Sequence, residues 1–470
     1  MNLIDKLKAI AGDNHVLTED DARAAYETDF TGAYKSRVLA VVRPKDTAEI
    51  AAVMKLASET RTVVVPMGGN TGLSGGAYAG DDGSAIILST ERLTKIREIN
   101  TSTRTAVVES GAVLETLHNA VDEHDLIFPL TFGARGSCRI GGVLATNAGG
   151  SNVLRYGNTR ALCLGLEAVT PEGEVLDLMS SLRKDNTGFD LRDLLIGSEG
   201  ALAVITAAVL KLFPKPAGYG TATIAVPDFD AALGLLNELN DVSNGSVEAF
   251  EYMSKEHFQQ MTVARPDLTA AIETLDHLTI MLEIGLVGGD SQQATEMLED
   301  VLGKAFEEGR VLDAAIAQNE AQRQSMWACR EAGLEIVQSR PPVILTDIAL
   351  PLDKIGTYLE IMEKRLPAVA PGAMSVVVGH LGDGNLHYTI WPDPDGKGLN
   401  EDRHIAISEE AEAVALDLGG SFSAEHGVGV YKLHAMRRFK NPVALDAMRR
   451  IKAAWDPNNI LNPGKLVPED

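Results

Sequence analysis

The stretch VVVPMGGNTGLSGGA, at residues 63–77, runs from an apolar, β-branched segment into a loop with five glycines in nine residues. The apolar segment predicts a strand, and the glycines predict a loop at its end. Because glycine carries no side chain, consecutive backbone N–H groups of this loop can line a nest for an anion. No lysine follows in P-loop spacing and no GxGxxG occurs in the chain, so P-loop and Rossmann nucleotide sites are weakly supported.

Two further glycine-rich loops follow in the same part of the chain. They are IGGVLATNAGGSNVLRYG at 140–157 and GFDLRDLLIGSEGALAVIT at 188–206. A single loop of this kind is more often a tight turn than a binding loop. Three such loops in one region, none matching a triphosphate motif, favour an extended cofactor that carries phosphate.

Strand-like runs and helices alternate with the glycine loops over residues 30–215. Strands are expected at 61–69, 84–90 and 103–111, an amphipathic helix at 113–124, and a hairpin at 167–178. The segment FPKPAGYG at 213–220 carries two prolines and two glycines and lacks periodicity. We therefore expect a domain boundary there.

The region beyond this boundary has a different order of elements. A strand, a helix, two strands and a helix are expected at 221–226, 230–241, 246–253, 277–287 and 292–309. This order resembles a split βαβ, ferredoxin-like layer. A long helix around 325–337, a histidine-bearing hairpin, and a tail from about 425 with a helix at 443–455 complete the chain. A length of 470 residues fits two or three domains.

The charge balance excludes several kinds of partner. With 66 acidic and 42 basic residues the formal net charge is −24, which repels nucleic acid and anionic lipid surfaces. The opening 13 residues form an amphipathic helix without the features of a signal or transit peptide, and no apolar run is long enough to span a membrane. Cys138, Cys163 and Cys329 lack CxxC spacing, so a reducing cytoplasm fits best.

The hairpin GHLGDGNLHY, at 379–388, holds two of the ten histidines. Apolar and β-branched flanks predict two strands, and Asp383-Gly384 fits a two-residue loop. In that register His380 lies opposite His387, and Asn385 shares their face because it is two residues from His387. Two imidazoles and an amide side by side predict a metal site, although a pair of hydrogen-bonded histidines is the alternative.

A third metal ligand is available in SFSAEHGVG, at 421–429. There, Glu425 and His426 lie in a glycine-flanked turn of the kind that carries site residues. Two imidazoles and one carboxylate with open positions describe a catalytic site for zinc or another divalent first-row ion, manganese and iron included. Because adjacent side chains diverge in direction, Glu425 and His426 are expected to have different roles.

The glycine motifs resemble a known family. PMGGNTGLSGG, TNAGGSNVLRYG and GSEGALAVIT, in this order, are similar to the FAD-binding half of the flavoproteins typified by vanillyl-alcohol oxidase and p-cresol methylhydroxylase. HLGDGNLH, SAEHGVG and the terminal NPGK narrow the resemblance to the branch of D-lactate dehydrogenase, D-2-hydroxyglutarate dehydrogenase and the glycolate oxidase flavoprotein subunit. The resemblance covers the chain from about residue 30 onward.

The resemblance implies an α+β fold with a two-part FAD-binding domain of the p-cresol methylhydroxylase type. It comprises residues 1–217, with a core from about 38, completed by a C-terminal helical segment at 425–470 that returns to it. A ferredoxin-like cap, the substrate domain, would occupy residues 218–424 and carry the metal-binding hairpin.

The resemblance also implies which residues bind FAD. The loop at 67–73 would hold the pyrophosphate, residues 141–150 would run beside the flavin, Gly200 and Ile205 would lie near the adenosine, and Asn462 near the isoalloxazine. The full set is Pro66, Met67, Gly68, Gly69, Asn70, Thr71, Gly72, Gly141, Gly142, Thr146, Asn147, Gly149, Gly150, Gly200, Ile205 and Asn462. Some relatives attach FAD through a histidine where this chain has Asn70, so non-covalent FAD is expected.

For catalysis, the resemblance implies that His380, His387 and Glu425 bind the metal and that His426 is the base. Arg330, in WACREAG, would hold the substrate carboxylate through its guanidinium fork. The alternative for Arg330 is a helix-surface arginine in a salt bridge. Asn385 would orient the substrate or a metal ligand.

Two positions depart from the 2-hydroxyglutarate branch of the family. A threonine one helical turn after the arginine and a lysine before the Asp-x-x-x-Pro element are replaced by Leu334 and Leu345. Apolar side chains disfavour a second carboxylate, because a buried charge without a partner is costly. We therefore expect D-2-hydroxy acids with one carboxylate, lactate-like or with an apolar side chain, to be preferred.

The leading hypothesis is an FAD- and metal-dependent D-2-hydroxy acid dehydrogenase that forms a 2-oxo acid. Electrons would pass to an electron-transfer flavoprotein, a quinone or a cytochrome. The alternatives are a D-2-hydroxyglutarate dehydrogenase, an oxidase or glycolate oxidase-like flavoprotein subunit, and a non-catalytic FAD-binding scaffold. A homodimer is left open.

Overall fold

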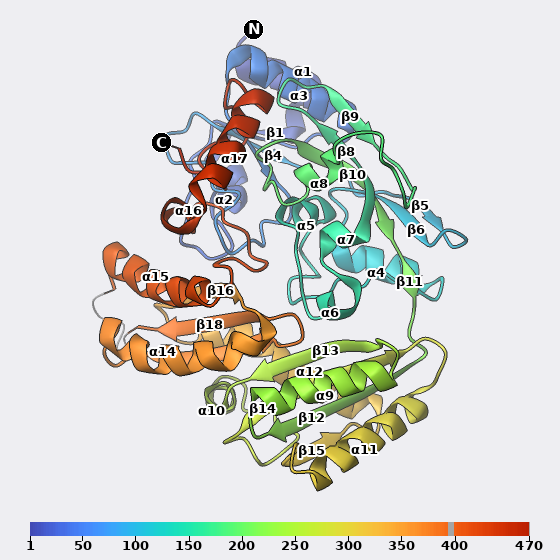
Figure 1. The fold of residues 1–470 in the computed structure, drawn as a ribbon. Helices are drawn as coiled ribbons and strands as arrows, with labels where there is room; N and C mark the ends of the chain where they lie inside the picture. The colour runs from blue at the N-terminus through green and yellow to red at the C-terminus, as the bar shows by residue number, and fades with distance from the viewer. Residues whose placement is uncertain (393–398, 470) are drawn as a thin grey trace. The chain divides into compact units, whose positions relative to one another are not determined.

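The computed structural model describes residues 1–392 and 399–469. The chain divides into two compact units (Figure 1). Unit 1 comprises Met1–Gly149, Gly157–Pro214 and Glu425–Asp470, and unit 2 comprises Gly150–Tyr156 and Lys215–Ala424. The mixture of helices and sheets confirms the α+β class expected from the sequence.

Unit 1 contains a sheet in the order β1-β2-β4-β3, in which β2, β4 and β3 are parallel. Its strands are β1 (Val16–Leu17), β2 (Ala40–Val42), β3 (Val64–Met67) and β4 (Ile86–Ser89). Apolar side chains from these strands pack against α1 (Leu3–Ala11) and α3 (Thr47–Thr60) on one face. On the other face Val41, Val65 and Ile87 pack against further apolar side chains. A sheet buried on both faces explains the continuous apolar run before the first glycine loop.

A second sheet of unit 1 is antiparallel, in the order β5-β6-β10-β8-β9. Its strands are β5 (Ile96–Asn100), β6 (Thr105–Glu109), β8 (Cys163–Val169), β9 (Val175–Leu178) and β10 (Val204–Lys211), and the short strands β7 (Leu126–Ile127) and β11 (Phe213–Pro214) pair separately. The β8–β9 pair is the hairpin expected at 167–178, and this prediction is confirmed.

The remaining helices of unit 1 lie in and around the glycine loops and in the C-terminal segment. They are α2 (Asp20–Glu27), α4 (Leu114–Asp122), α5 (Ile140–Thr146), α7 (Thr159–Leu162), α8 (Leu191–Leu195), α16 (Leu433–Phe439), α17 (Pro442–Trp455) and the 3-10 turn η1 (Asp13–His15). The C-terminal segment joins the first sheet directly, since Leu461 forms a parallel bridge with Val64 of β3. Lys452 Nζ, in α17, donates to Leu461 O at 2.6 Å within this segment and to Ala201 O of the third glycine loop at 2.8 Å.

Unit 2 is built on one large antiparallel sheet in the order β15-β12-β14-β13-β17-β18-β16. Its strands are β12 (Gly218–Val226), β13 (Val247–Met253), β14 (Leu278–Leu286), β15 (Asp313–Ile316), β16 (Ile344–Ala349), β17 (Met374–His380) and β18 (Asn385–Trp391). Its helices are α6 (Val153–Tyr156), α9 (Phe229–Val242), α10 (Lys255–Ala264), α11 (Ser291–Glu307), α12 (Glu320–Glu331), α13 (Gly333–Gln338), α14 (Ile355–Val369), α15 (Glu401–Asp417) and the 3-10 turn η2 (Leu352–Lys354).

The two faces of this large sheet are covered differently. On one face, apolar strand residues such as Ile224, Phe250 and Ile348 form a core with α9, α11, α14 and α15. On the other face, Met253 and Val378 pack against a smaller apolar cluster with α10, α12 and α13. Residues two apart on a strand point the same way, so Glu251 shares this face with Met253, and His380 shares it with Val378.

Two details of the sequence prediction for unit 2 are wrong. The single helix expected around 325–337 is two helices, α12 and α13, and the second begins at Gly333. Glycine weakens a helix by about 1 kcal/mol relative to alanine, which favours a break at this point.

The register of the histidine hairpin is also wrong. His380 pairs with Asn385 and Val378 pairs with His387, so the connection is 381–384 rather than two residues. Gly384 N–H donates to His380 O at 3.1 Å, and the positive φ of 84° at Gly384 is compatible with glycine. The pairing differs from the expected one by two residues, so His380, Asn385 and His387 still share a face. The two imidazole centroids are 5.4 Å apart.

Within residues 1–392 and 399–469, we find no helix with the length and apolar character needed to cross a bilayer.

Candidate functional site

A row of polar side chains crosses the less apolar face of the large sheet of unit 2. Register places its members on neighbouring strands from β12 to β16. The row consists of Thr221, Glu283, Glu251, His380, His387 and Asp347. Buried polar groups need hydrogen-bond partners. The bonds within and around this row therefore show which donors and acceptors are already used and which could bind a ligand.

Glu251 on β13 is a fully buried carboxylate of the row, with 0% exposure, as is Asp347. It is the register partner of His380, and its Oε1 lies 2.9 Å from His380 Nδ1. Its Oε2 accepts from Arg330 Nε at 2.8 Å. Burial by itself would raise the pKa of Glu251, but the nearby His380 and Arg330 outweigh it and hold the pKa below its ordinary value.

Arg330 lies in the last turn of α12, and its side chain is 11% exposed. The alternative expected from the sequence, a salt bridge, is present with Glu251, but it uses only Nε. Among the described residues, the buried Nη2 of Arg330 has no hydrogen-bond partner. A buried cationic donor in this state fits an anionic ligand, and a guanidinium fork suits a carboxylate.

Asn385 and His387 on β18 lie beside Asp347 of β16. Asn385 Nδ2 donates to Asp347 Oδ1 at 2.9 Å and to Ile348 O at 3.0 Å. The buried Asn385 Oδ1 has no partner within the described part of the chain. His387 Nδ1 lies 3.7 Å from Asp347 Oδ1, and the two residues are register partners. Asp347 therefore connects both predicted site residues of this strand.

Glu425 and His426 follow directly on Ala424, whose N–H donates to Asp347 Oδ2 at 3.1 Å. Asp347 and His387 of unit 2, and Glu425 and His426 at the start of the last segment of unit 1, each offer an atom that could bind a metal ion. Two imidazoles and two carboxylates are a donor set suited to a divalent first-row metal ion, so the residues fit such an ion.

The grouping includes two of the predicted metal ligands, His387 and Glu425, and the predicted base, His426. His380 is not one of its members, and Asp347 is a member that the sequence reasoning missed. The assignment of His380, His387 and Glu425 as the metal ligands stays a prediction.

The backbone around His426 is held within unit 1. Ser74 Oγ donates to the carbonyl of His426 at 3.1 Å. Glu199 accepts from the N–H groups of Val428 and Gly429, both at 2.7 Å. Burial raises the pKa of Glu199, while the two backbone donors and Lys432 act in the opposite direction. The loop that carries His426 is thus fixed by a carboxylate from the third glycine loop.

The first and third glycine loops and the second loop up to Gly149 lie together in unit 1. A Cβ on Gly68 would meet the backbone nitrogen of Gly142 at 3.3 Å, and one on Gly200 would meet Pro66 Cγ at 3.3 Å. Asn462 is buried, and its Nδ2 donates to Gly76 O at 3.1 Å and to Glu199 O at 2.7 Å.

The other predicted FAD residues are placed as follows: Met67 ends β3, Gly69, Asn70, Thr71 and Gly72 form the loop after it, Gly141 and Thr146 belong to α5, Asn147, Gly149 and Gly150 follow α5, and Ile205 is buried in β10.

Two features of these loops fit a bound FAD. A Cβ on Gly72 or on Gly142 would meet nothing within 4 Å, so open space adjoins the backbone of both loops. The buried Asn462 Oδ1 has no hydrogen-bond partner among the described residues, which leaves one acceptor for a ligand. Asn70 uses its amide to donate to Thr28 O at 2.8 Å, and it carries no group that could attach a flavin covalently.

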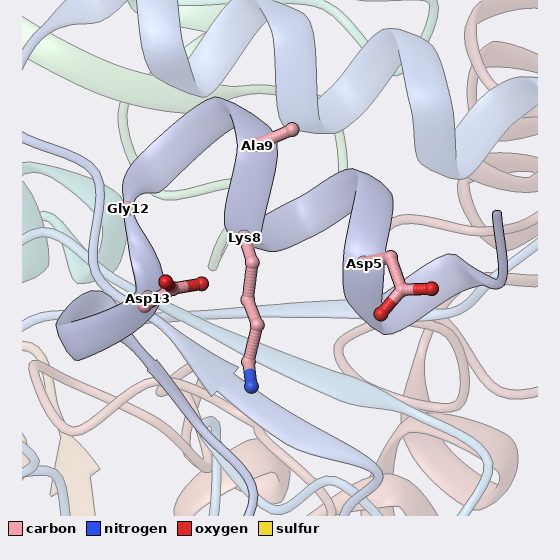
Figure 2. Close-up of a pocket in the computed structure, with 5 residues that line it drawn as sticks. All are labelled: Asp5, Lys8, Ala9, Gly12 and Asp13. Carbon is pink, nitrogen blue, oxygen red and sulfur yellow. The ribbon is translucent and has the colours of Figure 1, made fainter.

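A pocket at the N-terminus is unrelated to these sites. It is lined by Asp5, Lys8, Ala9, Gly12 and Asp13, at and just after α1 (Figure 2). None of these residues belongs to the predicted FAD or metal sets, so the pocket adds nothing to the candidate site.

The residues missed by the sequence reasoning share a signal. Glu251 interrupts VEAFEYM and Asp347 interrupts ILTDIA, both otherwise suited to strands, and Glu199 lies between two glycines in GSEGA. An acidic residue inside an apolar strand is costly to bury unless it has partners, so each marked a polar network. Which partners it would have depends on neighbouring strands, and the sequence did not reveal that.

Comparisons with known proteins give a consistent result. The model described as "FAD binding domain" matches residues 38–179, and "FAD linked oxidases, C-terminal domain" matches residues 215–466.

Relatives are named D-2-hydroxyglutarate dehydrogenase. The protein from Stutzerimonas stutzeri (strain A1501) is 33% identical over 99% of this chain and 98% of its own length. The mitochondrial proteins of Arabidopsis thaliana and Bos taurus are 34% and 36% identical, over 99% and 96% of this chain and 81% of each of those proteins.

Solved structures share the fold at low identity. A crystal structure of p-cresol methylhydroxylase with substrate bound matches with a TM-score of 0.76 and 16% identity, over 99% of this chain and 96% of that one. The 4-ethylphenol oxidase from Gulosibacter chungangensis matches with a TM-score of 0.74 and 17% identity, over 100% and 97% of the two chains.

Proposed function

From the premise that this chain belongs to the FAD-linked oxidases of the vanillyl-alcohol oxidase and p-cresol methylhydroxylase superfamily, and is an FAD-dependent dehydrogenase acting on a CH–OH group, we propose that its substrates are D-2-hydroxy acids. We propose that the preferred substrates carry one carboxylate and a small or apolar side chain, and that a divalent metal ion takes part. The chief support for a carboxylate in the substrate is the buried Nη2 of Arg330, which has no partner among the described residues.

Arg330 would bind the substrate carboxylate. Its Nε is already committed to Glu251, so Nη2 and the remaining guanidinium hydrogens face the ligand. A fixed guanidinium loses little freedom when it binds, and this orients the substrate carbon that bears the hydroxyl. Asn385 would add an acceptor, because its Oδ1 has no partner among the described residues while its amide hydrogens are bound to Asp347 and Ile348.

His426 would remove the hydroxyl proton as the general base. Ser74 Oγ donates to the His426 carbonyl, and Glu199 accepts from the N–H groups of Val428 and Gly429 in the same loop. Both contacts fix the backbone of this loop. His426 Nε2 lies 3.9 Å from Glu425 Oε1, so a carboxylate is available to stabilise the imidazolium once it forms.

Two bound groups would supply the remaining chemistry. Held by His380, His387 and Glu425, with Asp347 as a further donor, a divalent metal ion would lower the pKa of the substrate hydroxyl, and FAD would accept the α-hydrogen with its electron pair. Zinc suits the nitrogen and oxygen donors, with manganese and iron as alternatives.

The substrate preference rests on Leu334 and Leu345. Leu345 lies on β16 two residues before Asp347, so both side chains point to the face with the polar row. Leu334 is the second residue of α13, which follows α12 after Glu331, and it is 43% exposed. An apolar side chain at each position offers no partner to a second carboxylate, which disfavours 2-hydroxyglutarate.

Reduction of the flavin by a panel of acids tests this proposal. Purified protein with its metal content measured is mixed anaerobically with D- and L-lactate, longer apolar D-2-hydroxy acids and D-2-hydroxyglutarate, and loss of flavin absorbance is followed. We expect the D-monocarboxylic acids to have the higher specificity constants. A higher value for D-2-hydroxyglutarate would refute the preference, and bleaching by none of the acids would favour the non-catalytic scaffold.

A matched variant sharpens the test. Leu334→Thr combined with Leu345→Lys should raise the specificity constant for D-2-hydroxyglutarate and lower that for apolar acids. Steady-state kinetics on both substrates measure the switch.

We also propose an electron acceptor and a cell compartment. An electron-transfer flavoprotein, quinone or cytochrome is proposed in preference to oxygen, and peroxide formed under air would identify an oxidase instead. A cytoplasmic location is supported by Cys138, Cys163 and Cys329, which are buried and form no disulfide.

A further inference from the structure

Among the described residues of the polar row, Glu251 is the one that contacts both His380, a predicted metal ligand, and Arg330, the residue predicted to bind the substrate carboxylate. Both of its oxygens lie 2.9 Å from His380 Nδ1, and Oε2 also accepts from Arg330 Nε at 2.8 Å. His380 and Arg330 come from different elements, β17 and α12. A single buried carboxylate therefore connects a strand of the sheet with the helix that covers it.

The bond to His380 has a consequence for that imidazole. An ionised carboxylate only accepts hydrogen bonds, so Nδ1 of His380 is the nitrogen that carries the hydrogen. In the neutral imidazole, Nε2 then keeps its lone pair. A carboxylate behind a histidine is the arrangement that fixes the tautomer and raises the basicity of a metal-binding imidazole.

The bond to Arg330 has a parallel consequence for the guanidinium. With Nε held by Glu251, the planar fork can rotate very little, and its terminal nitrogens point to a fixed position. The buried Nη2, which has no partner among the described residues, is then presented in one orientation.

The competing explanation is that Glu251 only attaches α12 to the sheet. The neighbouring Glu283 is an example of such a structural role. Glu283 on β14 is 3% exposed and also binds α12, through Arg323 Nε and Nη2 at 2.7 Å and Trp327 Nε1 at 2.9 Å. It also accepts from Thr221 Oγ1 at 2.6 Å. Glu283 attaches the same helix to the same sheet, yet none of these partners is a predicted metal ligand or substrate contact.

We infer that Glu251 is a positioning residue that sets the His380 tautomer and the Arg330 orientation together, and so couples metal binding to binding of the substrate carboxylate. This inference rests on the proposed function for the roles of His380 and Arg330. Glu251 itself touches neither metal nor substrate. Loss of its charge should weaken both sites at once.

Glu251→Gln tests the inference because it keeps the shape and removes one acceptor. First, long-range ¹H–¹⁵N spectra of histidine-labelled protein report the imidazole tautomers without any turnover, and the His380 signals are identified by their loss in His380→Gln. We expect wild-type His380 to be protonated at Nδ1 and the variant to lose that preference. Second, competition with a chromophoric chelator measures Zn²⁺ affinity, which should fall about 10–100-fold.

Kinetics supply the third readout. The KM for the best 2-hydroxy acid should rise in Glu251→Gln, and adding Arg330→Lys should then have less effect than it has in the wild-type background. Glu251→Asp retains the charge at a shorter length, so it should recover part of the Zn²⁺ affinity. It also provides a second variant if Glu251→Gln does not fold.

Glu283→Gln is the matched control, since it removes a buried carboxylate that binds the same helix. It should lower the melting temperature while leaving the His380 tautomer and the Zn²⁺ affinity unchanged. Equal losses in Glu283→Gln, or a wild-type tautomer and Zn²⁺ affinity in Glu251→Gln, would overturn the inference. A wild-type protein that oxidises no 2-hydroxy acid but shows the Nδ1–H tautomer refutes the proposed function alone.

Discussion

In unit 1 the predicted cofactor loops present backbone groups next to open space, whereas in unit 2 the predicted substrate face presents charged side chains in contact with one another. Gly72 and Gly142 adjoin space that a side chain would fill, and Asn462 contributes a buried side-chain acceptor without a partner among the described residues. In unit 2, Glu251 and Asp347 each bind polar groups from two other segments, one of which is a neighbouring strand. The first surface suits an extended ligand, and the second suits a small charged one.

This difference means that the two surfaces should respond to different kinds of substitution. Adding a single methyl group should be enough to disturb a backbone surface, because there is no flexible side chain to move aside. A charge network should tolerate changes of shape better than changes of charge, because a buried charge without its partner is costly.

The largest effect should come from His426, the exception in unit 1 where a side chain is proposed to carry out chemistry. His426→Gln should slow reduction of the flavin by roughly 10²–10⁴-fold, because it removes the general base. Stopped-flow absorbance with a saturating D-2-hydroxy acid measures this rate. FAD content and the melting temperature should match those of the wild type. A rate within threefold of the wild-type rate would assign the base elsewhere.

The next effect concerns the backbone surface of unit 1. A Cβ on Gly69 would lie 2.3 Å from Ser137 O and 2.9 Å from Cys138 Cα, both main-chain atoms. Gly69→Ala should therefore lower the free energy of unfolding by about 3 kcal/mol, the upper part of the usual range for overpacking. Chemical denaturation of the FAD-free protein measures it.

Gly142→Ala is the matched control in α5, where a Cβ would meet nothing within 4 Å. Its FAD-free form should be as stable as the wild type or slightly more so, since alanine favours a helix. Its affinity for FAD should nevertheless fall, because the methyl group enters the space assigned to the cofactor. Unchanged FAD affinity would show that this space is not used.

The smallest expected effect concerns the stability of unit 2 at acidic pH, which should depend on the buried His257. Burial lowers the pKa of His257 to about 4 from its ordinary value of 6.5, against the hydrogen bond between its Nε2 and Cys329 O at 2.8 Å. Between these two values the unfolded chain binds the proton and the folded chain does not. The contribution of His257 to the free energy of unfolding is therefore fully present above pH 6.5. It decreases as the pH falls, by roughly 2 kcal/mol at pH 5.

His257→Gln should remove this part of the pH dependence, as measured by denaturation at pH 5 and pH 7.5. The exposed His277 provides the control, and His277→Gln should leave the pH dependence as it is in the wild type. An unaltered slope in His257→Gln would show that other groups account for the acid sensitivity.

The strands and glycine loops were predictable because each carries a local signal. The run before Gly68 is apolar on both sides and forms a strand covered on both faces, and the Pro-Glu-Gly turn connects β8 and β9 as expected. The shared face of His380 and His387 was also predictable, since it depends only on a period of two residues.

The hairpin register and the charge network were not predictable in the same way. A Cβ on Gly384 would meet Leu350 O at 2.2 Å, so the turn is shaped by a segment 34 positions earlier in the chain as well as by Asp383-Gly384 itself. The partners of Glu251 come from β17 and α12, far away in sequence. The local sequence shows that an acidic residue lies within an apolar strand. Its partners depend on the order of strands in the sheet, which the local sequence does not contain.

The edge of the first sheet has a consequence for how the protein is made. β3 is the last strand in that sheet, and its outer side is covered by the chain around Leu461: Val64 N–H donates to Ile460 O, and Asn462 N–H donates to Val64 O, both at 2.8 Å. Residues 65–459 are translated between these partners, which takes on the order of 20–80 s at the usual speed of a ribosome. Throughout that interval the nascent β3 has an uncovered edge that could pair with another chain, so chaperone demand should peak before the last 46 residues emerge.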